Sequence, residues 1–286
     1  MKLLSQGGLG NQLFFLNFAH QLKSEDKKKI SLISRSEPAL GDQREFEIGK
    51  ILNYCTHDIK SKEEDWPFDA FNILDRARVF KKSDSEFLSS YFNFLSVSNP
   101  FAAPKSIKNS SKFVRGYFQS AESVNFHLAS YFKEIVSASQ VNMNPKGTSE
   151  ETEKYQAIHI RRGDFIQSKQ KIGLLALPYY KSGVEKNLPL KIVTDGDLDF
   201  IKEIKAVFPE SEIYGPQEKN TWEAFNLLFH ASHLQIANST FSWWAGALAT
   251  FKGADVIAPK PWNLIPQEGI ENLTNPKFHY RNAVFE

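Results

Sequence analysis

The second half of the chain alternates short apolar runs with stretches of helical periodicity, and this alternation constrains the fold more than any other feature. The runs of strand length lie at 156–160, 190–194, 212–214, 234–237 and 255–258. The helical patterns between them lie at 179–185, 198–207, 221–231 and 242–251. Strands that alternate with helices are typical of a parallel, doubly wound sheet. We therefore predict an α/β protein, with Thr221 capping the third helix and 255–258 as the last strand.

The start of the chain repeats this organisation on a smaller scale. A short apolar strand leads into a glycine-rich turn at 7–12, an apolar helical pattern covers 13–22, and 30–33 has the composition of a second strand. A polar stretch at 142–154 is the best candidate for a linker. The sequence thus predicts two Rossmann-like domains, 1–145 and 155–286, which enclose a cleft.

Composition excludes several classes of function. The chain has 286 residues and a net charge of only +2, so it lacks the basic field of a nucleic-acid-binding protein. Its single cysteine, Cys55, cannot form an internal disulfide, which fits a reducing compartment. No run reaches the ~18 apolar residues of a membrane span. We expect a cytoplasmic protein with no nucleic-acid partner.

The segment HIRRGD at 159–164 carries the strongest chemical signal. It follows a predicted buried strand, and ligands of open α/β sheets bind beyond the carboxyl ends of the strands. Arginine forks match phosphate oxygens with two hydrogen bonds and stay charged at cellular pH. The segment therefore predicts a site for an anionic, diphosphate-like ligand. The alternative is a structural ion pair between Arg162 and Asp164.

Two further segments join a strand to a helix. In GGLGNQ at 7–12, glycines allow close approach of backbone to ligand, and Asn11 and Gln12 add amide donors at a helix start. In NSTFSWW at 238–244, hydroxyls and free N–H groups can hold phosphate oxygens. The alternatives are a plain turn capped by Asn11 and a helix capped by a serine or threonine. The tryptophan pair could stack on a ligand, but we expect at least one of the two in the core.

Asp195-Gly196-Asp197 follows a predicted strand and allows three interpretations. Two carboxylates at this spacing suit Mg²⁺ or Mn²⁺. Asp195 can instead accept hydrogen bonds from a guanine edge. A simple Asp-Gly turn is the third option. Elsewhere, we expect His230 and His233 near the end of a helix, in capping roles.

Four segments in chain order resemble one known family. They are GGLGNQ at 7–12, GYFQS at 116–120, HIRRGD at 159–164 and ANSTFSWW at 237–244. Together they resemble the α-1,2-fucosyltransferases of glycosyltransferase family eleven, in their short bacterial form. The resemblance spans nearly the whole chain, although residues 36–112 are not diagnostic.

The resemblance implies a GT-B-like fold, with an acceptor-side domain at 1–145 and a GDP-sugar-binding domain at 155–286. It implies inverting transfer of L-fucose from GDP-β-L-fucose to the 2-hydroxyl of a β-galactoside, in cell-surface polysaccharide (O-antigen) synthesis. GDP-fucose is then a substrate, and no cofactor and no metal are implied. A lipid-linked oligosaccharide acceptor, with peripheral contact at the inner face of the plasma membrane, is one option.

The resemblance also assigns roles to single residues. Arg161 contacts the β-phosphate of the donor, His159 lies near the guanosine, and Asp195 reads guanine, with Asp197 as the alternative. The implied donor-binding positions are His159, Arg161, Arg162, Asp195, Ser239, Thr240, Phe241, Gly8 and Gly10.

For catalysis we expect Arg161 to stabilise the departing diphosphate. Asp164 is a candidate base, although we favour a role in orienting Arg162, and Asn11 is expected to position the acceptor hydroxyl or fucose. Two rivals stay open. One is a glycosyltransferase for another sugar nucleotide with a metal on Asp195 and Asp197. The other is a non-catalytic module that binds a nucleotide or glycan.

Overall fold

The computed structural model divides the chain into two units. Unit 1 comprises Met1–Leu128 with Glu271–Thr274, and unit 2 comprises Ala129–Ile270 with Asn275–Glu286. The structure describes residues 1–26, 30–34, 45–49, 59–65, 67, 94–96, 100–101, 113–121, 124, 154–217 and 220–286. The expected linker at 142–154, apart from Lys154, and Cys55 lie outside these ranges.

Unit 1 is built on a parallel sheet in the strand order β3-β2-β1-β5-β4. Its elements are β1 (Lys2–Leu4), α1 (Leu9–Asp26), β2 (Ile30–Ser34), β3 (Ile59–Glu63), β4 (Phe94–Ser96) and β5 (Phe113–Arg115). Lys2 of β1 pairs with Ser31 of β2 on one side and with Phe113 of β5 on the other. The chain leaves β1 first toward β2 and β3 and later returns to the other side, so the strand order reverses between β1 and β5.

Helix α1 is apolar almost all round, which explains why it is buried on nearly every side through Leu22. The helix begins at Leu9, four residues earlier than the apolar pattern at 13–22 indicates, so Asn11 lies within its first turn rather than capping it. The tight turn before it depends on Gly7, whose φ of 78° lies in the left-handed region.

Unit 2 contains a six-stranded parallel sheet in the order β11-β10-β9-β6-β7-β8. Its elements are β6 (Gln156–Ile160), α6 (Phe165–Ser168), α7 (Leu177–Lys181), β7 (Leu190–Thr194), α8 (Leu198–Val207), β8 (Glu212–Tyr214), α9 (Thr221–His230), β9 (His233–Gln235), α10 (Thr240–Thr250), β10 (Asp255–Lys260), η2 (Ile270–Leu273), which belongs mostly to unit 1, and β11 (His279–Asn282). Read from β8 across to β11, this is the Rossmann order, which reverses between β6 and β9.

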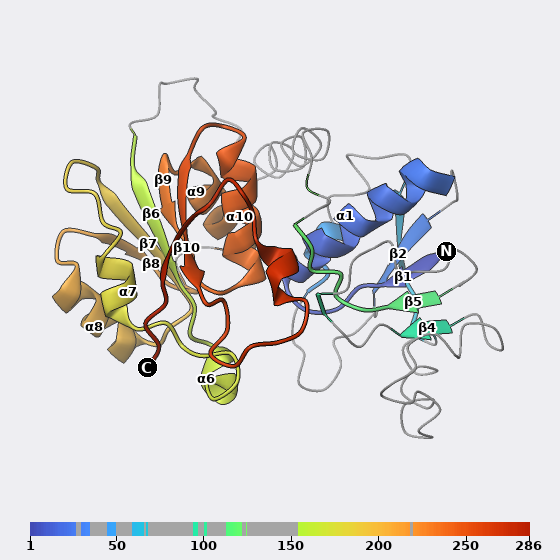
Figure 1. Cartoon of the computed structure of the whole chain (residues 1–286), viewed down its shortest axis with the longest axis horizontal. Helices are drawn as coiled ribbons and strands as arrows, with labels where there is room; N and C mark the ends of the chain where they lie inside the picture. The colour runs from blue at the N-terminus through green and yellow to red at the C-terminus, as the bar shows by residue number, and fades with distance from the viewer. Residues whose placement is uncertain are drawn as a thin grey trace. The chain divides into compact units, whose positions relative to one another are not determined.

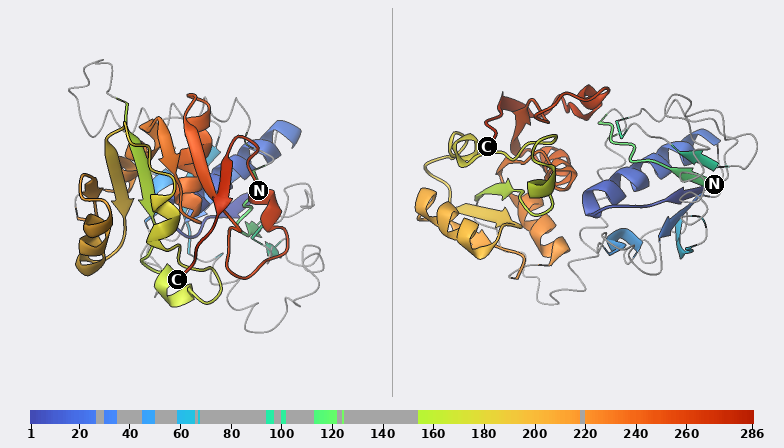
Figure 2. Two further views of the ribbon diagram at one scale, coloured as in Figure 1. Left: turned by 60° about the vertical axis from the view of Figure 1, so that its left-hand side comes forward. Right: turned by 90° about the horizontal axis from the view of Figure 1, so that it is seen from below.

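Helices cover both faces of this sheet, with α7 and α8 on one side and α9 and α10 on the other (Figure 1 and Figure 2). All five residues of β6 are buried, as a central strand covered on both faces requires. One core cluster under α7 and α8 includes Ile158, Ile192 and Phe200. Under the other face, Trp243 and Trp244 of α10 are both fully buried. Both tryptophans therefore belong to the core, and neither is a stacking platform for a ligand.

Side-chain caps fix where two helices of unit 2 begin. The Asp197 carboxylate accepts a hydrogen bond of 2.9 Å from the Phe200 amide, so Asp197 is the N-cap of α8. Helix α9 has a capping box in which Asn220, not Thr221, is the N-cap and Glu223 bonds back to the Asn220 backbone. The predicted cap at Thr221 was wrong by one residue, because the preceding amide side chain already satisfies the free N–H groups.

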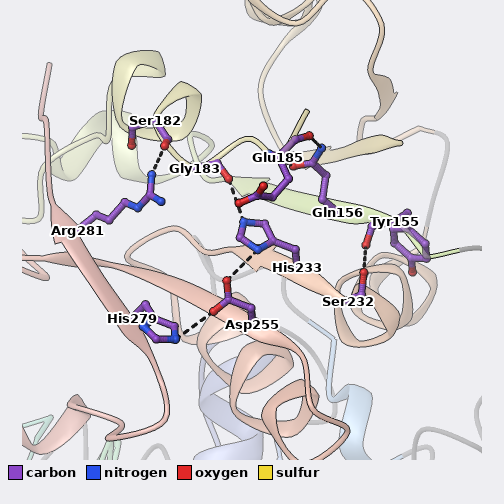
Figure 3. A network of polar contacts seen from close by, with 10 residues as sticks. All are labelled: Tyr155, Gln156, Ser182, Gly183, Glu185, Ser232, His233, Asp255, His279 and Arg281. Atoms are coloured by element: carbon purple, nitrogen blue, oxygen red, sulfur yellow. Dashed lines mark hydrogen bonds and ion pairs between the residues drawn. The ribbon is translucent and has the colours of Figure 1, made fainter. Parts of the chain in front are cut away.

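A polar network holds the amino ends of the strands of unit 2 (Figure 3). His233, the first residue of β9, bonds to the Gly183 carbonyl at 2.9 Å and to Asp255 at 3.0 Å, and Asp255 also contacts His279 at 3.2 Å. His233 lies just after the end of α9, as expected, but it begins β9, and its ring contacts Gly183 and Asp255 instead of capping the helix. His279 begins β11, an added edge strand after β10, so 255–258 does not mark the last strand.

The predicted α/β class with two Rossmann-type units, the organisation of a GT-B-like fold, is confirmed. Strands 156–160, 190–194 and 212–214 and helix 198–207 have the predicted bounds. In the part of the chain that the structure describes, no helix is both long and apolar enough to cross a membrane.

Candidate functional site

Unit 2 gathers the predicted donor-binding side chains at the carboxyl edge of its sheet. HIRRGD extends from the end of β6, Asp195 follows β7, and Ser239 and Thr240 open α10 after β9. Strands β7, β6 and β9 are neighbours in the sheet, and the strand order reverses between β6 and β9. The predicted side chains therefore converge on the switch point, where open α/β sheets bind their ligands.

Arg161 lies between two carboxylates at this edge. Its Nη1 contacts Asp195 Oδ2 at 2.5 Å, and its Nη2 contacts Asp164 Oδ1 at 2.5 Å. The arginine side chain is 21% exposed and that of Asp164 is 48% exposed. Asp164 thus orients Arg161, not Arg162, and the predicted ion pair between Arg162 and Asp164 was wrong. The reason is local: the turn that starts α6 brings residues three apart onto the same side.

Arg162 turns away from Asp164. Its guanidinium forms an ion pair with Glu286 and lies 3.9 Å from the centre of the Phe200 ring in α8. Its backbone amide donates to Asp195 Oδ1 at 2.6 Å. Cation–π stacking and a carboxylate together fix this side chain.

Asp195 therefore connects both arginines, one through its guanidinium and the other through its backbone. Gly163 makes this possible, because a Cβ there would lie 2.4 Å from Asp195 Oδ2. Each carboxylate oxygen already has a protein partner, so the carboxylate organises the arginine loop.

His159 and Arg161 present buried nitrogens that have no partner among the described residues. His159 is 3% exposed, and within the described part of the chain neither its Nδ1 nor Arg161 Nε has a hydrogen-bond partner. Burial, and secondarily the charge of Arg161, lower the pKa of His159 to about 3, so the imidazole is neutral. A buried unpaired polar group costs about 1–3 kcal/mol, so a ligand oxygen at these nitrogens would recover stability.

The first turn of α10 lies beside His159. The rings of His159 and Phe241 are 5.4 Å apart, centre to centre. Ser239 is the N-cap of α10 by its extended backbone, but its side chain makes no capping hydrogen bond. The expected alternative, a serine that merely caps the helix through its side chain, is therefore wrong for Ser239. Buried N–H groups of a helix start attract anions.

The Asp195–Asp197 spacing does not produce a paired carboxylate site. Asp197 caps α8, whereas Asp195 pairs with Arg161. Among the described residues, no group of three or more histidine, cysteine or acidic side chains is arranged to hold a metal ion.

Two amide side chains, Asn11 and Gln119, meet at the carboxyl edge of unit 1. Asn11, in the first turn of α1, accepts a hydrogen bond of 3.0 Å at Oδ1 from Gln119 Nε2, which follows β5. Gln12 is 2% exposed and binds the Gly7 and Glu45 carbonyls and the Ile48 amide, so it braces the loop. The Gly8 carbonyl accepts hydrogen bonds from the backbone N–H groups of Asn11 and Gln12, and Gly10 lies within α1.

Sequence reasoning missed several partners of these residues. Glu286 and Phe200, which hold Arg162, lie far from it in the chain, and no motif marks them. Gln119 stands in the GYFQS segment that was noted without a role. Gly7 rather than Gly8 or Gly10 has the positive φ, a distinction that spacing alone does not give.

Comparison with known proteins finds similar glycosyltransferases. The chain is 28% identical to an alpha-1,2-colitosyltransferase of Escherichia coli over 90% of both chains. It is 24% identical to the O-antigen biosynthesis glycosyltransferase WbnK of Escherichia coli, over 90% of this chain and 92% of that one. Among solved structures, fucosyltransferase NodZ from Bradyrhizobium is similar at 11% identity and a TM-score of 0.46, over 85% of this chain and 91% of that chain.

The model of one family covers most of the chain, matching residues 2–272. The chain belongs to glycosyl transferase family 11 and is a glycosyltransferase.

Proposed function

We propose that the protein transfers L-fucose from GDP-β-L-fucose to the 2-hydroxyl of a β-galactoside acceptor, with inversion at the anomeric carbon. Supporting this are the α-1,2 linkage named for the colitosyltransferase relative and the O-antigen role named for WbnK. The acceptor is then an O-antigen-type oligosaccharide, and a lipid-linked precursor is included in the proposal.

The observation that carries the proposal is the arginine at the switch point of unit 2. Arg161 is oriented by two carboxylates, and neither its Nε nor the nearby His159 Nδ1 has a partner among the residues that the structure describes. A diphosphate oxygen and a nucleoside hydroxyl are ligands that fit such nitrogens. The start of α10, beside His159, supplies further N–H donors for an anion.

Charge accumulates on the leaving GDP as the sugar–phosphate bond breaks, and a preorganised cation at that position lowers the barrier. Asp195 and Asp164 preorganise Arg161 before the donor binds, so little reorganisation is needed during the reaction. In this account Asp164 positions Arg161 and is not the base. Arg161, not a metal ion, offsets the growing charge, since Asp197 is used in capping α8. The reaction then needs neither a metal nor another cofactor.

A second donor is favoured by one specific observation. The relative at 28% identity is a colitosyltransferase, and colitose is L-fucose without its 3-hydroxyl. A site that hydrogen-bonds the 3-hydroxyl strongly rejects the deoxy sugar, whereas an apolar pocket discriminates between them weakly. The contacts that the site makes at the 3-hydroxyl therefore decide which of these two closely related sugars is the donor.

The test is an assay of GDP release with GDP-fucose or GDP-colitose, each with a β-galactoside acceptor and each with and without EDTA. We expect release with GDP-fucose that depends on the acceptor and persists in EDTA. Proton and ¹³C NMR of the product, through the anomeric proton coupling and the shift of the substituted carbon, then identify an α-1,2 linkage.

Each other outcome assigns a different function. Faster turnover with GDP-colitose makes colitose the donor. Loss of activity in EDTA that Mg²⁺ or Mn²⁺ restores would refute the arginine mechanism. GDP-sugar binding without release, over a panel of acceptors, would favour a binding module.

A further inference from the structure

A hydrogen bond between two amide side chains joins the segments that meet at the switch point of unit 1. Gln119 Nε2 donates to Asn11 Oδ1 at 3.0 Å. Asn11 follows β1 and Gln119 follows β5, and these strands are parallel neighbours. The pair therefore lies at the carboxyl edge of the sheet, where the strand order reverses.

The backbone that brings Gln119 to this place is strained. Phe118 has a φ of 52°, which is unfavourable for a residue other than glycine. Its ring is buried and stacks on Phe18 of α1 at 4.2 Å, with Phe15 edge-on at 5.6 Å. The backbone N–H of Gln119 donates to the Pro100 carbonyl at 2.8 Å. Strain that surrounding packing enforces is typical of functional positions.

The hydrogen bond also sets which end of the Asn11 amide faces which way. The Asn11 oxygen accepts from Gln119, so its nitrogen lies on the other side, against Gly7. A Cβ on Gly7 would lie 2.5 Å from Asn11 Nδ2, and the φ of 78° at Gly7 already favours glycine. Gly7, Phe118 and Gln119 thus all serve one orientation of one amide.

We propose that Gln119 is a positioning residue that fixes the Asn11 amide, so that Asn11 offers its N–H₂ group to a hydroxyl oxygen of the acceptor sugar. A neutral donor suits this task, because a sugar hydroxyl oxygen accepts hydrogen bonds and carries no charge. The proposal rests on the proposed function for the identity of the bound sugar, whereas the orientation of Asn11 can be tested without turnover.

The first test compares Gln119→Glu with Gln119→Met. An ionised glutamate only accepts hydrogen bonds, so Gln119→Glu should reverse the Asn11 amide and present its oxygen instead. We expect kcat for transfer to fall by about 10–100-fold, as for a displaced substrate. The Kd for GDP should stay within about twofold, since the arginines proposed to hold the diphosphate lie in unit 2.

The second test is a double-mutant cycle. Gln119→Met, which keeps length without polarity, should lower kcat in the wild-type background and change nothing further in Asn11→Ala. A role limited to holding the loop predicts that the two effects add. Equal melting temperatures confirm that the variants fold. If Gln119→Glu does not fold, Gln119→Met alone serves as the test.

An NMR measurement separates this proposal from the proposed function. In protein labelled with ¹⁵N-asparagine, the Asn11 side-chain signal is the one that Asn11→Ala removes. It should shift strongly in Gln119→Glu, in which the Asn11 N–H₂ donates to a carboxylate. An unshifted signal, or full transfer activity in Gln119→Glu, overturns the proposal. If wild-type protein transfers no sugar at all, the proposed function fails while the signal still tests the orientation.

Discussion

The two Rossmann-type units carry different polar side chains at equivalent places. At the carboxyl edge of unit 2, two arginines are held by Asp164, Asp195 and Glu286. At the carboxyl edge of unit 1, the corresponding switch point carries the neutral amides of Asn11 and Gln119. The same topology therefore carries arginine–carboxylate pairs in one unit and a pair of amides in the other, and the loops after the strands decide which.

The difference matches the two partners of a glycosyl transfer. A leaving diphosphate gains negative charge and needs fixed cations, whereas an acceptor hydroxyl needs only directed hydrogen bonds. Carboxylates around an arginine fix its direction without removing its charge. We infer that the ion pairs of unit 2 serve orientation more than stability, because ion pairs with partial exposure contribute about 0–1 kcal/mol.

The largest effect should come from removing the central cation of the charged edge. Arg161→Ala should lower kcat by about 10²–10³-fold, because one preorganised donor to a developing charge is lost. Arg161→Lys should also be poor, since an ammonium cannot engage both carboxylates and a phosphate with the same planar fork. Acceptor-dependent GDP release is the measurement.

Asn11→Ala provides the matched change at the carboxyl edge of unit 1. It should alter the kinetics for the acceptor while leaving the Kd for GDP intact, whereas Arg161→Ala should weaken GDP binding. If Arg161→Ala folds normally and keeps more than about a tenth of wild-type kcat, a cost below ~1.4 kcal/mol, the charged edge does not have the proposed role.

The strands and helices of unit 2 could be predicted closely because their sequence signals are local. Strands 156–160 and 190–194 are apolar and bounded by polar residues, so periodicity alone locates them. Edge strand β11 was not predicted, because its residues, His279–Asn282, are polar and partly exposed. In unit 1, β3 is Ile-Lys-Ser-Lys-Glu, which also lacks an apolar pattern. Edge strands are defined by pairing with a neighbouring strand, and this pairing cannot be predicted from the sequence of one segment.

The site could be predicted in its members but not in its pairings. A strand that ends in His-x-Arg-Arg places Arg161 and Arg162 at a sheet edge whatever the rest of the chain does. Which carboxylate faces which arginine depends on side-chain direction, so Asp164 was assigned to the wrong one. Glu286 lies 124 positions from Arg162, and only the tertiary fold brings them together.

A smaller effect is expected where the orientation of the cation changes but its charge remains. Asp195→Asn keeps an oxygen for the Arg162 amide and loses the ion pair to Arg161. We expect kcat to fall by about tenfold, since Arg161 keeps Asp164 but loses one of its two fixed directions. Steady-state kinetics with saturating GDP-fucose measure this.

The matched control is Asp197→Asn, which keeps an oxygen for the α8 cap and leaves the arginines unchanged. It should retain kcat within about twofold, as asparagine and aspartate are near-equal N-caps. Equal losses in the two variants would contradict an orienting role for Asp195. A greater loss in Asp197→Asn, restored by Mg²⁺, would support the metal-dependent rival.

The neutral imidazole at the charged edge should make stability depend on pH. Burial and Arg161 lower the pKa of His159 to about 3, whereas an unfolded chain titrates near its ordinary 6.5. Between these values the unfolded state holds a proton that the folded state lacks, so stability falls as pH decreases below 6.5. One such group contributes up to about 1.4 kcal/mol per pH unit. His159→Asn should remove this share of the slope, measured by urea unfolding at pH 5 and pH 7.

His230 offers a comparison outside the site. Burial and Lys252 lower its pKa to about 4, so His230→Asn should also reduce the slope between 6.5 and 4. Of these two variants, only His159→Asn should weaken GDP binding, because His159 lies at the switch point and His230 does not. An unchanged slope in His159→Asn would show that this imidazole is protonated in the folded protein at low pH.

The smallest effect is expected at Glu286, and it tests how far the charged edge extends. Glu286→Gln removes the ion pair with Arg162 but leaves the stack of Arg162 on Phe200. The backbone N–H of residue 286 still donates to the Leu174 carbonyl. Because the Glu286 side chain is 38% exposed, the ion pair contributes little, and we expect kcat and the Kd for GDP to change by less than about threefold. Exposed Glu268→Gln is the matched control. A tenfold loss confined to Glu286→Gln would place Arg162 beside Arg161 in holding the diphosphate, with Glu286 as its positioning residue.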